Sequence, residues 1–247
     1  MSLSGTWMDV ITIDNVTKEF GSLRAVDSVD LRIPQGTLFG LLGPNGSGKT
    51  TMIKMMTGQI RPTKGAIMVS GIDVLEHPVK VRENVGIIPE QETPPSFLTS
   101  EEYLEFVCKI RNIKDYEELI DHWFDLLDFN DQRKTLCKDL SRGTRQKLMV
   151  AQAFLHEPSI AFIDEPLINL DPIIQRTLKD FLQDYVKKGN TLFFSTHVLE
   201  IAEEICTHIG IIDHGHILHT GEIRDLKQKK QHLDDFFLKL VKKEGIS

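Results

Sequence analysis

The sequence lacks any long hydrophobic run. No stretch approaches the roughly 18 consecutive apolar residues of a membrane helix, and the start has no charged segment followed by an apolar signal core. We therefore expect no membrane-spanning helix and a chain that stays in the cytoplasm.

Cysteine is scarce. The three cysteines, Cys108, Cys137 and Cys206, are widely separated, odd in number and without the spacing of a metal site. This pattern predicts reduced structural thiols and argues against a disulfide framework or a zinc site.

Positive charge is also in deficit. With 36 acidic and 29 basic residues, the formal net charge is −7, which argues against a nucleic-acid partner. The composition otherwise suits a soluble enzyme, because 40% hydrophobic residues in a chain of 247 can bury a substantial core. A single large domain over residues 1–247 is predicted.

The strongest positive signal is the run GPNGSGKTT, which matches the phosphate-binding pattern G-x-x-x-x-G-K-[ST] directly after the apolar run 37–42. Its glycines admit backbone angles that let successive N–H groups cradle an anion, and the following helix adds its positive end. We expect Lys49 to reach the terminal phosphates, Thr50 to offer its hydroxyl to Mg²⁺ and Thr51 to contact the α-phosphate. The predicted nucleotide-binding residues of this loop are Gly43, Pro44, Asn45, Gly46, Ser47, Gly48, Lys49, Thr50 and Thr51.

Two carboxylates, Asp164 and Glu165, follow the apolar run 159–163, which is typical of a strand at the centre of a parallel sheet. Asp164 is predicted to bind Mg²⁺ through water. Glu165 is predicted to polarise the water that attacks the γ-phosphate. The alternative is an acidic pair at the start of a solvated loop.

A solitary histidine, His197, follows a similar apolar run at 191–195. Its imidazole could bind an oxygen of the γ-phosphate and respond to its presence during catalysis. A purely structural histidine is the alternative.

The order and spacing of these motifs resemble the nucleotide-binding subunit of an ATP-binding cassette (ABC) transporter, from about Ile11 to Leu240. The family's signature LSGGQ corresponds to Leu140, Ser141, Arg142, Gly143 and Thr144. Arg142 and Thr144 depart from that pattern, as in many relatives of ABC exporters. The resemblance implies that residues 141–144 act on the ATP of a second subunit, so that two nucleotides lie between two chains.

The same resemblance assigns three further positions. It implies that Phe20 stacks on adenine, with a strand-end core residue as the alternative, and that Asn169, Leu170 and Asp171 form a dimer loop. The family's glutamine after an apolar strand falls at Glu90 or Gln91. We favour Glu90, which puts the contribution of this loop to Mg²⁺ binding in doubt.

The expected fold class is α/β, with the P-loop NTPase core and its parallel sheet, an antiparallel β subdomain from the N-terminal part, and an inserted helical lobe at 91–157. Within that lobe, Thr99 and Glu102 predict a capping box for a helix that ends near Ile110. The C-terminal tail, 220–247, mixes lysines with apolar residues. It is predicted to dock one apolar face on the domain, and a membrane-surface helix is the alternative.

The resemblance implies an ATP-hydrolysing subunit that powers transport, with ATP and Mg²⁺ as cofactors. Its implied partners are a second ABC subunit and a polytopic membrane permease, which would hold the chain on the cytoplasmic face of the membrane. About fifty residues separate the Glu90 region from Ser141, too few for the coiled coil of chromosome-organising relatives. A soluble assembly ATPase and a nucleotide-gated binding module remain as alternatives.

Overall fold

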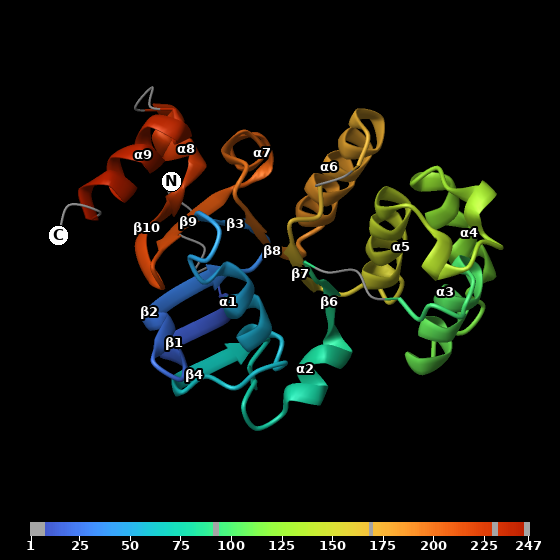
Figure 1. Ribbon diagram of the computed structural model, residues 1–247, viewed down its shortest axis with the longest axis horizontal. Helices are drawn as coiled ribbons and strands as arrows, with labels where there is room; N and C mark the ends of the chain where they lie inside the picture. The colour runs from blue at the N-terminus through green and yellow to red at the C-terminus, as the bar shows by residue number, and fades with distance from the viewer. Residues whose placement is uncertain (1–7, 91–93, 168–169, 229–231, 245–247) are drawn as a thin grey trace, which may run out of the picture.

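The computed structural model describes residues 8–90, 94–167, 170–228 and 232–244 (Figure 1). Its centre is a sheet that, within these residues, has the strand order β10-β9-β3-β8-β7-β6. The strands are β3 (Leu38–Leu42), β6 (Val85–Ile88), β7 (Ile160–Asp164), β8 (Thr191–Thr196), β9 (His208–Asp213) and β10 (His216–Glu222). All run parallel except β10, which pairs antiparallel with β9 at the edge. The predicted parallel core is confirmed.

The continuous apolar runs of the sequence are explained by burial on both faces of this sheet. Every residue of β3, β7 and β8 is buried. On one face, Phe39 stacks on Phe193 with ring centroids 5.6 Å apart, and on the other, Leu42 and Phe194 belong to a second cluster. Strands covered on both faces need apolar side chains at successive positions.

A second sheet is antiparallel and has the strand order β2-β1-β4-β5 in the part of the chain that the structure describes. Its strands are β1 (Asp9–Phe20), β2 (Leu23–Pro34), β4 (Lys64–Val69) and β5 (Ile72–Asp73). Helix α1 (Lys49–Met56) buries Met52 and Met56 in the hydrophobic cluster that this sheet shares with the central one. The predicted antiparallel subdomain is therefore present.

Three helices lie on the opposite side of the molecule from the antiparallel sheet (Figure 1). They are α3 (Ser100–Ile110), α4 (Glu117–Leu126) and α5 (Arg142–Phe154), with 3₁₀ turns at Asn130–Gln132 and Cys137–Asp139. The capping box is confirmed, because Glu102 N donates to Thr99 Oγ1 at 3.3 Å and Thr99 N donates to Glu102 Oε2 at 2.8 Å. The bounds 91–157 for a separate lobe stay a prediction.

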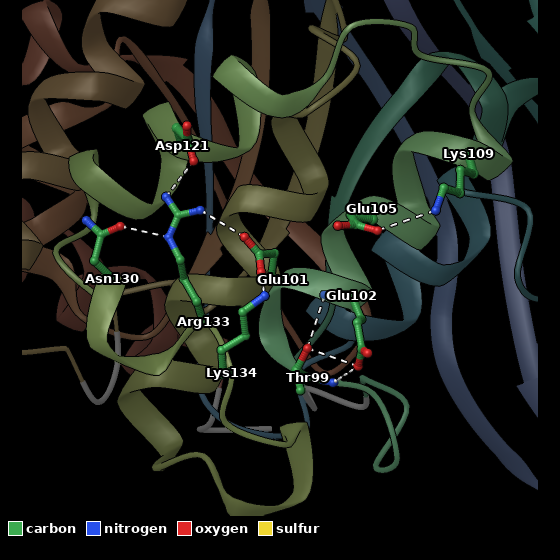
Figure 2. A network of polar contacts seen from close by, with 9 residues as sticks. All are labelled: Thr99, Glu101, Glu102, Glu105, Lys109, Asp121, Asn130, Arg133 and Lys134. Carbon is green, nitrogen blue, oxygen red and sulfur yellow. Dashed lines mark hydrogen bonds and ion pairs between the residues drawn. The ribbon is translucent and has the colours of Figure 1, made fainter.

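A polar network ties this helical region together (Figure 2). The guanidinium of Arg133 pairs with Glu101 at 3.1 Å and with Asp121 at 2.7 Å, and it lies 4.3 Å from the ring centroid of Phe124. Lys134 also pairs with Glu101. These contacts link α3 and α4 to the segment that leads to Ser141. A guanidinium is planar and carries several donors, so contacts with more than one partner fix its geometry as well as adding binding energy.

The remaining helices cover the central sheet and its edge. They are α2 (Pro78–Asn84), α6 (Pro172–Lys187), α7 (Leu199–Ile205), α8 (Ile223–Gln228) and α9 (Leu233–Glu244). In α9, Leu233 is buried, and Phe236 and Leu240 pack against the cluster around α7. The prediction that the tail docks an apolar face is confirmed for these residues, whereas the limits 220–247 remain a prediction.

Two predictions from composition concerned the cysteines and membrane-spanning helices. All three cysteines lie in the part of the chain that the structure describes and are free and buried, as predicted for structural thiols. Burial raises the pKa of the Cys108 thiol to about 11, which keeps it protonated and unreactive at neutral pH. None of the described helices is long and apolar enough to cross a membrane.

Candidate active site

The strand order brings together motifs that are distant in the sequence. Strands β3, β8, β7 and β6 are successive neighbours and parallel, so their carboxyl ends share one edge of the sheet. The phosphate loop follows β3, His197 follows β8, Asp164 ends β7 and Glu90 follows β6. Ligands of open α/β sheets bind at this edge.

The phosphate loop has the backbone that an anion requires. Gly46 and Gly48 have φ angles of +82° and +112°, in the left-handed region that favours glycine. At Gly43 there is no room for a side chain, because a Cβ atom there would lie 2.3 Å from Ile212 O and 2.5 Å from Ser47 Oγ. Gly48 is the N-cap of α1, and no described side chain caps that end. The first N–H groups of α1 are thus available to a phosphate.

Lys49 is buried at the start of α1, and its ammonium is held by the loop itself. Nζ donates to Gly43 O at 2.8 Å and to Pro44 O at 3.0 Å. Burial lowers the pKa of Lys49, while the carboxylates of Glu165, Asp164 and Glu90 oppose that shift. The carbonyl contacts hold the cation beside the loop, where it can turn to a bound phosphate.

The predicted metal ligands converge. Thr50 Oγ1 donates to Asp164 Oδ2 at 2.7 Å and lies 3.5 Å from Glu90 Oε2, and Ser195 Oγ donates to the other oxygen of Asp164. This set of hydroxyl and carboxylate oxygens suits Mg²⁺, which is held by one or two carboxylates together with substrate phosphates. No cluster of three or more His, Cys, Asp or Glu residues that could hold a metal occurs among the described residues. The site fits a nucleotide-bound Mg²⁺ better than a metal held by protein alone.

Glu90 and Gln91 stay the two candidates for the glutamine position. Glu90 lies beside Thr50, as expected if it occupies this position, whereas Gln91 lies outside the described residues. The carboxylate at this place gives the site one more negative charge than an amide would.

Glu165 is held in a fixed orientation next to the phosphate loop. Thr196 Oγ1 donates to its Oε2 at 3.0 Å, and its Oε1 accepts from His197 N at 3.0 Å and lies 2.7 Å from His197 Nδ1. Its φ of +52° is unusual for a residue other than glycine. Such strain persists only where surrounding contacts impose it, and it is common at active sites. The side chain is therefore placed by the backbone and by three donors on β8 and just after it.

His197 contacts Glu165 directly, which gives a measurable expectation. Replacing His197 with alanine should slow ATP hydrolysis by about 10- to 100-fold, because a hydrogen bond to a charged group contributes roughly 1.5–3 kcal/mol. Steady-state phosphate release would measure this rate, with His122→Ala on α4 as the matched control, since His122 is exposed and remote from this cavity. Equal rates for the parent and His197→Ala would assign His197 a structural role only.

These groups line a single cavity of about 480 Å³. Its lining residues are Phe20, Leu23, Ala25, Asn45, Gly46, Gly48, Lys49, Thr50, Thr51, Glu90, Arg142, Asp164, Glu165 and His197. Leu23 and Ala25 were not predicted to line it, because they belong to an ordinary alternating strand. Ser195 and Thr196, which donate to Asp164 and Glu165, were not predicted either, although two hydroxyl residues directly before His197 were an available signal.

Phe20 lies at one end of this cavity. It is 48% exposed, so the alternative of a strand-end core residue is wrong. Lys18 Nζ lies 4.8 Å from the centroid of its ring. β1 ends at Phe20, where the chain turns into β2 and leaves the ring facing solvent and cavity. An accessible aromatic face can stack on a base, as the resemblance implies.

The signature residues are placed by the start of α5. Ser141 is its N-cap, and its Oγ accepts from Thr144 N at 3.1 Å. Gly143 lies in the first turn, whose free N–H groups favour an anion. Of residues 141–144, Arg142 lines the cavity formed by the phosphate loop of its own chain. This placement was not predicted, because the resemblance implies a contact with a second subunit.

Asp171 has a structural role that the sequence pattern did not reveal. Its Oδ1 accepts from Ile173 N and Ile174 N, both at 3.0 Å, and so caps α6. These backbone hydrogen bonds lower the pKa of Asp171. Asn169, its predicted neighbour in the dimer loop, lies outside the described residues.

Comparison with known proteins agrees with this geometry. A family model described as ABC transporter matches residues 26–168. The chain is 32% identical to "Uncharacterized ABC transporter ATP-binding protein YhaQ" of Bacillus subtilis (strain 168), over 96% of this chain and 81% of that protein. It is also 32% identical to "Bacitracin transport ATP-binding protein BcrA" of Enterococcus faecalis, over 92% of this chain and 74% of that protein.

Solved structures agree with the fold. One described as "Structure of ATP binding subunit of ABC transporter" has a TM-score of 0.88 and 26% identity, with 94% of this chain and 99% of that chain covered. A dimeric ATP-binding cassette bound to ADP and Pi has a TM-score of 0.80 at 23% identity, over 87% of this chain and 99% of that chain. The family model and the relatives each span most of the chain, and on that basis this chain belongs to the ABC transporter family, as an ATP-binding subunit with ATPase activity.

Proposed function

We propose that this chain uses the cavity between the phosphate loop, β7 and β8 to bind and hydrolyse ATP, and that hydrolysis powers a membrane transporter. The observation that carries the proposal is the convergence of Lys49, Glu165 and His197 on one cavity. Relatives named as transport ATP-binding proteins support transport over the soluble assembly ATPase.

The two ends of the cavity bind different parts of ATP. The loop N–H groups, the start of α1 and Lys49 bind the phosphates, and the exposed ring of Phe20 stacks on the base. Thr51 lies next to Thr50 in the first turn of α1, where its hydroxyl can reach the α-phosphate. The nucleotide is thus fixed at both ends, with its terminal phosphate toward the carboxylates.

Thr50, Asp164 and Glu90 would hold Mg²⁺, which neutralises charge on the terminal phosphates when bound. Ser195 keeps one oxygen of Asp164 occupied, so that the other oxygen faces Thr50. The chain's own groups therefore orient the ligands before nucleotide arrives.

Glu165 acts as the general base for the attacking water. It accepts a proton from the water as the new bond to the γ-phosphorus forms and the bond to the bridging oxygen breaks, which gives ADP and phosphate. His197 and Thr196 orient the carboxylate through the contacts measured above. The hydrolysis that follows needs no covalent intermediate on the protein.

Hydrolysis is coupled to transport through partners. Ser141, Arg142, Gly143 and Thr144 at the start of α5 would contact the nucleotide of a second ABC subunit, and Asp171 would lie at that interface. A polytopic permease would hold the pair at the cytoplasmic face of the membrane. Closure on ATP and opening after hydrolysis would then move the permease.

The test is affinity purification of the tagged chain from detergent-solubilised membranes of its native host, followed by identification of the proteins recovered. We expect to recover a polytopic membrane protein in stoichiometric amount, and we expect it to stay bound to the tagged chain during washing. Recovery in the soluble fraction with soluble partners alone would contradict the transport proposal and leave the ATPase itself intact.

A further inference from the structure

The signature residues at the start of α5 follow a segment with little regular structure. Residues 133–136 belong to no helix or strand, and a 3₁₀ turn at Cys137–Asp139 leads to Leu140 and the N-cap Ser141. The core anchors α5 from Gln146 onwards, whereas Ser141 is exposed and residues 143–145 are half-buried. The position of the first turn of α5 therefore depends on what holds the segment 133–140.

The backbone of this segment pairs with the start of α3. Four contacts join the two stretches: Glu101 N donates to Arg133 O at 3.1 Å, Ser100 N donates to Thr135 O at 3.1 Å, Cys137 N donates to Leu98 O at 2.8 Å, and Thr99 forms an antiparallel bridge with Leu136. Beyond Cys137 the segment continues to Ser141 without further pairing of this kind among the described residues.

The side chain of Arg133 adds contacts that the backbone does not supply (Figure 2). Its Nη1 donates to Glu101 Oε1 on α3 at 3.1 Å, and its Nη2 lies 2.7 Å from Asp121 Oδ1 on α4. Its Nε donates to Asn130 Oδ1 at 2.9 Å. All three nitrogens of the guanidinium are thus engaged, which fixes the segment to two helices at once.

The pair of Arg133 and Glu101 is partly shielded from water. The two side chains are 22% and 20% exposed, so solvent and salt screen this pair less than a fully exposed one. The hydrogen bonds from Lys134 and Arg133 lower the pKa of the Glu101 carboxyl, which is therefore ionised at neutral pH. Lys134 would remain as a partner of Glu101 if Arg133 were replaced, so no buried charge would be left alone.

At its other end, the segment is tied to the first turn of α5. Ser141 Oγ accepts from Thr144 N at 3.1 Å, and Arg145 Nη2 donates to Leu140 O at 3.1 Å. A displacement of residues 133–140 would therefore move Ser141 and the free N–H groups at the start of the helix.

We propose that Arg133 is a positioning residue for the signature. By holding residues 133–140 against α3 and α4, it presents Ser141 and the first N–H groups of α5 in the orientation that binds the nucleotide of a second subunit. This inference rests on the proposed function and assigns a role to a residue outside the signature. Arg133 does not line the nucleotide cavity, so it acts on the pairing of two chains and not on ATP binding by one chain.

The first test compares pairing with binding. Light scattering follows dimer formation by Glu165→Gln and by Glu165→Gln with Arg133→Gln as ATP is raised in the presence of Mg²⁺. We expect the ATP concentration for half-maximal pairing to rise by about 2- to 30-fold, the range for substitutions that alter coupling without touching a ligand. The affinity of the monomer for a fluorescent ATP derivative should stay within about twofold, whereas a general loss of structure would weaken both.

The second test needs no partner. Hydrogen–deuterium exchange of the single chain reports on the N–H groups of Thr144 and Arg145, which bond to Ser141 Oγ and Ser141 O. Arg133→Gln should speed their exchange by about 2- to 30-fold, because the first turn of α5 opens more often when the segment before it is released. Exchange in α1 should equal that of the parent.

Two further variants make the result specific. Arg133→Lys keeps the charge without the planar donors and should restore only part of the pairing. Arg32→Gln removes an arginine that is ion-paired with Asp14 in the antiparallel sheet, and it should change neither pairing nor exchange at the start of α5.

Other results would overturn the proposal. These are an unchanged ATP dependence of pairing in Arg133→Gln, unchanged exchange at Thr144 and Arg145, or equal losses in monomer affinity and pairing. Failure of the proposed function has a different signature, because Glu165→Gln with Arg133 intact would then bind no ATP or stay monomeric. The exchange measurement would still decide whether Arg133 orders the start of α5.

Discussion

Replacing Lys49 with alanine is expected to weaken ATP binding by at least about 100-fold, since a hydrogen bond to a charged group contributes roughly 1.5–3 kcal/mol and the ammonium can make more than one to the terminal phosphates. The variant also leaves Gly43 O and Pro44 O without their donor, so the loop loses order before nucleotide arrives. Equilibrium titration with a fluorescent ATP derivative measures the loss directly.

Lys80→Ala is the matched control for that experiment. Lys80 in α2 carries the same charge, but its side chain is exposed and does not line the 480 Å³ cavity. Its ATP affinity should stay within about twofold of the parent, as expected for a surface substitution. Tight ATP binding by Lys49→Ala would mean that the phosphates do not lie in this loop.

Replacing Glu165 with glutamine is expected to reduce ATP turnover by about 10² to 10⁴-fold, the range for the loss of a general base. Glutamine keeps the size of the side chain and can still accept from His197 N, but it cannot take a proton from water. ATP binding should be retained, because Glu165 is not among the cationic groups or loop N–H donors that attract phosphate. Phosphate release measures turnover.

The same variant tests the paired arrangement. When ATP is bound but not hydrolysed, two chains should remain closed over two nucleotides, so light scattering should detect a dimer with Mg²⁺ and ATP and a monomer with ADP. Glu200→Gln in the first turn of α7 makes the same chemical change at an exposed residue and should behave as the parent. A Glu165→Gln chain that stays monomeric at saturating ATP would argue against the homodimer, and undiminished turnover would exclude Glu165 as the base.

The parts of this protein that were predictable from sequence are those that neighbouring residues determine. The phosphate loop between β3 and α1 is encoded by consecutive residues, because its glycines set the backbone and α1 supplies the N–H groups. The capping box of Thr99 and Glu102 spans four residues and formed as expected. The apolar runs of β7 and β8 likewise predict strands that are buried on both faces.

Other features required contacts that local sequence does not encode. The side-chain hydroxyl of Thr50 meets Asp164 because β7 lies two strands from β3 across β8, and no spacing along the chain specifies that order. On the sequence alone, Phe20 could be a core residue or line the cavity, and only its exposure at the turn from β1 to β2 distinguishes the two. The placement of Glu90 beside Thr50 depends on where β6 ends at the sheet edge.

Sequence by itself determined that this chain binds nucleotide phosphates and has an α/β core, because both follow from backbone geometry and from apolar periodicity over short segments. The tertiary structure alone decided which side chains share the cavity. Glu165 and His197 meet because neighbouring parallel strands end at one edge, and Arg142 reaches its own chain's cavity because α5 begins there. Such juxtapositions depend on strand order and helix packing between residues far apart in the chain, where the sequence carries no local signal.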